Sequence, residues 1–181
     1  MARGIRPLLF ASAVLAAVLL SRPALAGPPL LCFPFDIGSA RSLPMGHGNW
    51  HEMDSRYDVS HLVPDTLALL TPAMPVLVRM ETLRRATLYA AAHPKLATAL
   101  LDELQARAVA PQPAVSALAV FDFGYLVESY KEAKYLFKEP LPALDRIDGY
   151  QLVLKAHALQ NDAAMQHAAK LIVDGYPRGT R

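Results

Sequence analysis

The feature that most constrains the fold is a helical spacing of apolar residues, which begins at Pro64 and is interrupted by prolines. Two successive segments each place apolar side chains on a single helix face. The first face comprises Val76, Met80, Leu83, Thr87 and Ala91, and the second comprises Leu96, Leu100, Leu101, Leu104 and Ala108. No two alternating β-branched runs are joined by a turn dipeptide, so the sequence predicts an all-α fold.

Prolines and turn residues divide this region into about five to six helices. We expect a short helix at residues 64–70 and a longer one with Pro72 and Pro75 in its first turn, where a missing N–H costs nothing. His93 and Pro94 end that helix and start the next one. A joint this short predicts an antiparallel hairpin, so we expect a bundle or short solenoid arranged partly as such hairpins.

A long helix is expected at residues 114–137, after a proline-rich break. It has the widest apolar surface in the chain and should therefore lie at the centre of the fold. A last helical pair is expected at residues 147–159 and 163–173, divided by Asn161 and Asp162. One of these two polar side chains can cap the second helix of the pair.

Residues 27–63 are expected to form an irregular arm that precedes a helical domain at residues 64–181. Prolines and glycines within the arm would interrupt any helix repeatedly. Its composition is too apolar for a solvated tail, so the arm should wrap over the helices and bury its large side chains. These side chains are Leu30, Leu31, Phe33, Phe35, Ile37, Trp50 and Tyr57.

Residues 1–26 have the three parts of a cleavable secretory signal peptide. Arg3 and Arg6 give a positive start, an uncharged apolar stretch follows, and Ala24-Leu25-Ala26 supplies small residues before the cut. The stretch between Arg6 and Arg22 is shorter than the roughly 20 residues of a membrane-spanning helix, which disfavours an uncleaved anchor. We expect export to the periplasm or out of the cell, with no stable membrane span after cleavage.

Cleavage would remove three arginines and no acid, leaving 15 basic against 16 acidic residues. This near-neutral balance disfavours nucleic acid as a partner, because proteins that bind it carry a clustered basic face. The single cysteine, Cys32, has no partner for an internal disulfide. It is expected to be a free thiol, either buried under the arm or cross-linked to a second chain.

His47, His51 and His61 lie in the segment that is densest in potential metal ligands. Histidines four residues apart could share a zinc or copper ion if the segment were helical, with His61 or a carboxylate as the third ligand. Two glycines weaken that geometry, and the zincin motif is missing. The alternative, which we favour, is a polar surface loop anchored by Trp50, with no cofactor.

Arg79, Glu81, Arg84, Arg85 and Asp122 form a second group of charged residues. Glu81 and Arg85 have the spacing of an ion pair on a surface helix. Asp122 lies between two phenylalanines of the long helix, so we expect it to be buried, with Arg84 or Arg85 as its partner. Buried pairs of this kind are more often structural than catalytic.

Glu128, Lys131, Glu132 and Lys134 are expected to form a solvated face of the long helix. The sequence contains no nucleophile motif around a serine, no local cysteine and histidine motif, and no glycine-rich phosphate loop. No catalytic or cofactor-binding residue is therefore assigned from the sequence.

Two segments resemble known groups of proteins. Leu152 to Ile172, followed by Pro177, resembles one tetratricopeptide unit, with two short helices, alanines at the positions of close helix contact and a proline after the second helix. Residues 32–44, with the sequence CFPFDIGSARSLP, resemble the opening of a group of uncharacterised exported bacterial proteins. The second resemblance implies export and a shared fold, and it implies no activity.

These observations favour an exported, non-catalytic helical module that binds a protein, a peptide or a small molecule outside the cytoplasm. The alternative is a metal-dependent extracytoplasmic enzyme that uses His47, His51 and His61. A third role, a dimer cross-linked through Cys32, also stays open.

Overall fold

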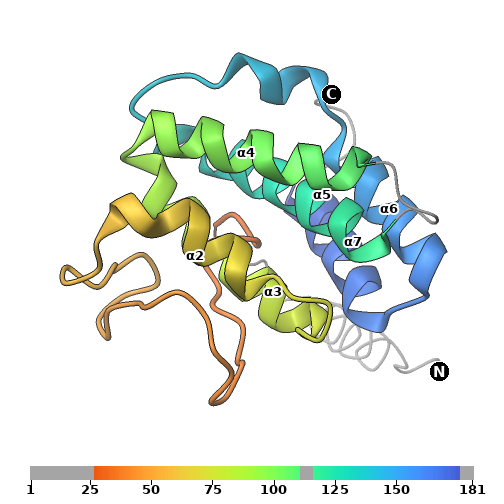
Figure 1. The fold of residues 1–181 in the computed structure, drawn as a ribbon, viewed down its shortest axis with the longest axis horizontal. Helices are drawn as coiled ribbons and strands as arrows, with labels where there is room; N and C mark the ends of the chain where they lie inside the picture. The colour runs from red at the N-terminus through yellow and green to blue at the C-terminus, as the bar shows by residue number, and fades with distance from the viewer. Residues whose placement is uncertain (1–26, 111–115, 176–181) are drawn as a thin grey trace, which may run out of the picture.

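The computed structural model describes residues 27–110 and 116–175, so the expected signal peptide and the first residues of the expected long helix lie outside them. Within these ranges the chain is helical and has no strand, which confirms the all-α prediction (Figure 1). None of the helices in these ranges is long and apolar enough to cross a membrane. The elements are η1 (Val59–His61), α2 (Leu62–Leu69), α3 (Val76–Ala91), α4 (Pro94–Val109), α5 (Ala117–Glu132), η2 (Ala133–Tyr135), η3 (Pro142–Arg146), α6 (Gly149–Gln160) and α7 (Ala163–Gly175).

The helix boundaries follow the local signals with two main corrections. The long helix ends at Glu132 rather than at residue 137, and the short helix η2 follows it. Pro94 is the first residue of α4, as expected, and only two residues separate α3 from α4. Pro72 and Pro75, however, both precede α3, because the ψ angle of 146° at Pro75 is extended and the helix begins one residue later. Asp162 confirms the expected cap, since its Oδ1 accepts hydrogen bonds from the first turn of α7.

Helix α5 lies at the centre of the fold, as its wide apolar surface predicts. Every residue from Val120 to Tyr130 is buried, and α3, α4, α6 and α7 all pack against this helix. The approach of α6 is closest at Gly124, where a Cβ atom would lie 2.7 Å from the Cβ of Leu152 and 2.8 Å from the carbonyl oxygen of Gly149. A larger residue at position 124 would therefore push the two helices apart.

The arm covers the helices without forming regular structure of its own before η1. Leu30, Leu31 and Leu43 are at most 1% exposed and belong to the core. Phe33 is an exception to the expected burial, because it is 38% exposed. A turn closed by the hydrogen bond from Cys32 N to Pro28 O directs the two leucines inward and leaves Phe33 outside.

Candidate functional site

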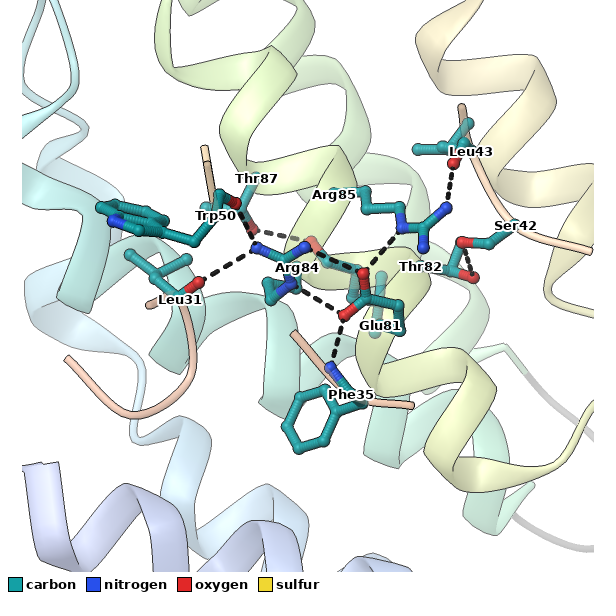
Figure 2. A network of polar contacts seen from close by, with 11 residues as sticks. Leu31, Phe35, Ser42, Leu43, Trp50, Glu81, Thr82, Arg84, Arg85 and Thr87 are labelled. Carbon is teal, nitrogen blue, oxygen red and sulfur yellow. Dashed lines mark hydrogen bonds and ion pairs between the residues drawn. The ribbon is translucent and has the colours of Figure 1, made fainter. Parts of the chain in front are cut away.

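The most extensive polar network lies between α3 and the arm, and Glu81 is at its centre (Figure 2). The Glu81 carboxylate accepts hydrogen bonds from Arg84 Nε at 2.8 Å, from Arg85 Nε at 2.7 Å and from the backbone N of Phe35 at 3.0 Å. Burial alone would raise the pKa of Glu81, but hydrogen bonds from the two arginines hold it below its usual range. The expected pair of Glu81 with Arg85 is therefore present, although Glu81 is fully buried rather than on a surface helix.

The two arginines also bind backbone carbonyls of the arm. Arg84 Nη1 donates to Leu31 O at 3.0 Å and to Trp50 O at 2.8 Å. Arg85 Nη1 donates to Leu43 O at 2.6 Å. Because the arm has no helix or strand here to satisfy its backbone, α3 side chains supply the missing partners. We call Glu81, Arg84 and Arg85 the arm clamp.

Tyr89 extends this attachment along α3. Its hydroxyl donates to Pro44 O at 2.9 Å and accepts a hydrogen bond from Asp54 N at 3.1 Å. Its ring also packs against Tyr57, with 5.0 Å between the ring centroids. Successive side chains of one helix therefore hold successive points of the arm.

Asp122 is buried, as expected, but its partner is Arg79. Arg79 Nη1 lies 2.5 Å from Asp122 Oδ2, and the two side chains are 2% and 6% exposed. The expectation of Arg84 or Arg85 is wrong, because both of those side chains bind Glu81 and the arm. Burial raises the pKa of Asp122 to about 6, and Arg79 opposes that rise, so the carboxylate is ionised at pH 7.

The acids of the expected solvated face on α5 are in fact buried. Glu128 is 0% exposed and Glu132 is 6% exposed, whereas Lys131 is half-buried and Lys134 is exposed. The prediction fails because the start of α6 and the arm cover this side of the helix. Glu128 Oε1 accepts from Tyr150 N at 3.1 Å, and Glu132 Oε2 accepts from Leu30 N at 2.9 Å.

The carboxyl group of Glu132 is buried and has few polar neighbours. Burial raises its pKa to about 8, the hydrogen bond from Leu30 lowers it, and the nearby Glu128 raises it further. Its Oε1 atom has no hydrogen-bond partner among the described residues, and the same holds for Tyr125 Oη and Ser129 Oγ on the same stripe of α5. A protonated Glu132 at pH 7 is consistent with these surroundings, because the neutral form avoids a buried unpaired charge.

The three candidate metal ligands do not converge. His47, His51 and His61 are all exposed, and no three His, Cys, Asp or Glu residues of the described chain are grouped to hold a metal. The segment around the first two histidines forms turns rather than a helix, so the four-residue spacing does not place them on one face. The ring of His51 instead packs against Trp50, with 4.7 Å between centroids. Cys32 is a half-buried free thiol whose pKa is raised by burial.

A partly open cavity of about 130 Å³ lies between the end of α5 and the segment that leads to α6. This segment crosses the top of the view in Figure 1. Its apolar walls are Tyr130, Phe137, Pro140, Leu141, Pro142 and Leu144, and its charged lining residues are Lys131, Lys134, Glu139 and Asp145. Three of the four charged residues are exposed, so their charges lie at the opening. Wider hollows beside residues 40–44 and α2 are more open to solvent.

No local pattern in the sequence indicates this cavity. Residues 138–142 contain two prolines and so indicate only a break after the long helix, whereas the short helix η3 begins at Pro142 itself. The available signal was the presence of Leu141 and Leu144 in a proline-rich connection, since exposed linkers are usually polar. Apolar residues in such a connection indicate that it folds back onto the protein.

Comparison with known protein families, with curated proteins and with solved structures finds no match to this chain. Function is therefore inferred from the described geometry. The arm clamp and the Arg79–Asp122 pair use their charges to hold elements of the fold together. The cavity is different, because its exposed charged residues surround an apolar interior.

Proposed function

We propose that this chain is an exported, non-catalytic helical module that binds a small molecule in the cavity between α5 and η3. The observation that carries the proposal is the cavity itself, with its apolar walls and charged opening. Small-molecule sites in proteins are mostly apolar hollows with a few polar groups that orient the ligand. A volume of about 130 Å³ is close to that of an apolar cavity of about 150 Å³ that accepts benzene.

The walls of the cavity are held in place from several sides, which favours a preformed site. The Tyr130 hydroxyl donates to Ala97 O at 3.4 Å, and the Tyr130 ring packs edge-on against Phe137 with 5.1 Å between centroids. The backbone N of Lys138 donates to Ala91 O at 3.3 Å and so ties the covering segment to the end of α3. A preformed cavity binds with little cost of ordering its walls.

Export is the second part of the proposal, and it depends on the three-part pattern of residues 1–26. The mature chain would begin at or near Gly27, directly after the small residues Ala24 and Ala26. Expression with the native amino terminus, followed by amino-terminal sequencing of the exported protein, tests this part. A start at or near Gly27 would support it, and a protein that keeps Met1 and stays in the cytoplasm would refute it.

The binding part can be tested by nuclear magnetic resonance on the ¹⁵N-labelled chain, with toluene and phenol as benzene-sized probes. We expect amide shifts centred on Phe137, Leu141 and Leu144. A Leu141→Trp variant, which fills the cavity from its covering segment, should lose these shifts. If neither probe shifts these amides in the unmodified protein, the proposed function is wrong.

A further inference from the structure

We propose that the ligand of this cavity is a free apolar α-amino acid, whose side chain enters the cavity while its two charged groups meet the charged residues at the opening. This inference rests on the proposed function, because it names the ligand class of the same site. Two observations support it: the volume of the cavity, and the presence of both positively and negatively charged residues around one opening.

The volume limits the apolar part of the ligand. A cavity of about 130 Å³ accommodates a single six-membered ring or a branched chain of similar size, as benzene-binding cavities do. The side chains of phenylalanine and leucine meet this limit. An indole ring or a long acyl chain exceeds it.

Lys134 and Lys131 offer positive charge to a carboxylate. Lys134 is exposed, and it takes part in none of the hydrogen bonds or ion pairs found in the described part of the chain. The Lys131 ammonium donates to Glu128 Oε1 at 2.8 Å and to Ile147 O at 2.6 Å. An ammonium has three hydrogens, so Lys131 retains one donor for a ligand.

Glu139 and Asp145 offer negative charge at the same opening. Both are exposed, and none of the ion pairs within residues 27–110 and 116–175 includes either of them. Their carboxylates can accept hydrogen bonds from an α-ammonium group. Two cationic and two anionic residues make the lining neutral overall, which suits a zwitterion better than a ligand with a single charge.

Titration calorimetry with L-phenylalanine and two analogues tests this inference. 3-Phenylpropionate lacks the ammonium group, and 2-phenylethylamine lacks the carboxylate. We expect L-phenylalanine to bind about tenfold more tightly than either analogue, because each analogue leaves one pair of charged residues without a partner. L-Leucine should also bind, and L-tryptophan should not.

The variant Lys134→Gln tests whether Lys134 binds the carboxylate of the ligand. This variant should bind L-phenylalanine about fivefold more weakly and should keep its affinity for 2-phenylethylamine, since only L-phenylalanine carries a carboxylate. Lys138→Gln is the matched control, because Lys138 is also exposed but does not line the cavity, and it should change neither affinity. Equal affinity for L-phenylalanine and either analogue would overturn the inference. If toluene binds in the cavity but L-phenylalanine does not, only this inference fails. If neither toluene nor phenol binds, the proposed function fails as well.

Discussion

Glu132 on α5 accepts a hydrogen bond from the backbone of Leu30, which lies 102 residues earlier in the chain, with 2.9 Å between Glu132 Oε2 and Leu30 N. Glu81 on α3 does the same for Phe35, at 3.0 Å. Side-chain carboxyl groups on two helices therefore accept hydrogen bonds from the arm backbone, which has no neighbouring strand or helix turn to do so. Stability of the arm should depend on the charge of these side chains.

The raised pKa of Glu132 predicts a pH dependence of stability. The folded-state pKa is about 8, against 4.5 for an ordinary glutamate, so between these values the folded chain holds a proton that the unfolded chain has lost. The Glu132 contribution to the free energy of unfolding should therefore fall as pH rises through this window, by up to about 1.4 kcal/mol per pH unit. Glu132→Gln should abolish this contribution while keeping an acceptor for Leu30 N.

Urea unfolding of the native chain and of Glu132→Gln at pH 5, 6, 7 and 8 measures this effect. The variant should gain stability relative to the native chain as pH rises. Glu103→Gln on the exposed side of α4 is the control and should show no such trend. A difference between Glu132→Gln and the native chain that is constant across this range would contradict the assignment.

Loss of Arg84 should detach the arm. Arg84→Met removes the donors to Leu31 O and Trp50 O and leaves Glu81 with a buried charge that Arg85 only partly offsets. Breaking a buried ion pair from one side typically costs about 3–5 kcal/mol, so we expect a loss of stability of this size. Limited proteolysis should then cut within residues 27–58. Arg146→Met, at an exposed position of η3, should leave both stability and the cleavage pattern unchanged.

Asp122→Asn should destabilise the contact between α3 and α5. The substitution leaves the Arg79 guanidinium buried without its counter-charge, and we expect a loss of about 3 kcal/mol or more in the free energy of unfolding. Adding Arg79→Met to Asp122→Asn should recover part of that loss, because no unpaired charge then remains buried. An unchanged melting temperature for Asp122→Asn, or two additive losses in the double variant, would show that the pair does not support the fold.

Gly124→Ala tests the close approach of α5 and α6. Alanine favours a helix over glycine by about 1 kcal/mol, so an uncrowded position would be stabilised. Here the new Cβ would lie 2.7 Å from the Cβ of Leu152, and overpacking costs about 1–3 kcal/mol. We expect a net loss of stability in thermal unfolding. Ala99→Gly, at an exposed position of α4, is the control, because its change in stability measures the difference in helix propensity between alanine and glycine alone.

The histidine segment gives a prediction about metals. Because His47, His51 and His61 are exposed and not grouped with one another, we expect no stabilisation of the chain by added zinc. The His47→Ala, His51→Ala double variant should behave like the native chain in a thermal shift assay with zinc and copper. Stoichiometric metal in the purified native chain that disappears in the double variant would contradict this and would revive the metal-dependent alternative.

The sequence was informative for several features whose signal is local. The joint at His93 and Pro94, the cap at Asp162 and the central place of α5 all follow from residues within a few positions of one another. Helical periodicity and capping act over three or four residues, so they can be recognised without knowledge of the rest of the fold. The burial of Asp122 also followed from its two apolar neighbours.

By itself, then, the sequence determined an all-α chain with an irregular arm, because apolar spacing and proline placement are properties of the chain in one dimension. Only the tertiary structure decided that Arg79 rather than Arg84 pairs with Asp122, that Glu128 and Glu132 are buried, and that a cavity forms beside η3. The path of the arm, and of the segment between α5 and α6 that sets where α6 begins, decides these outcomes. Both are irregular segments without periodicity, and their contacts join residues tens of positions apart, so no local pattern specifies which side chains they cover.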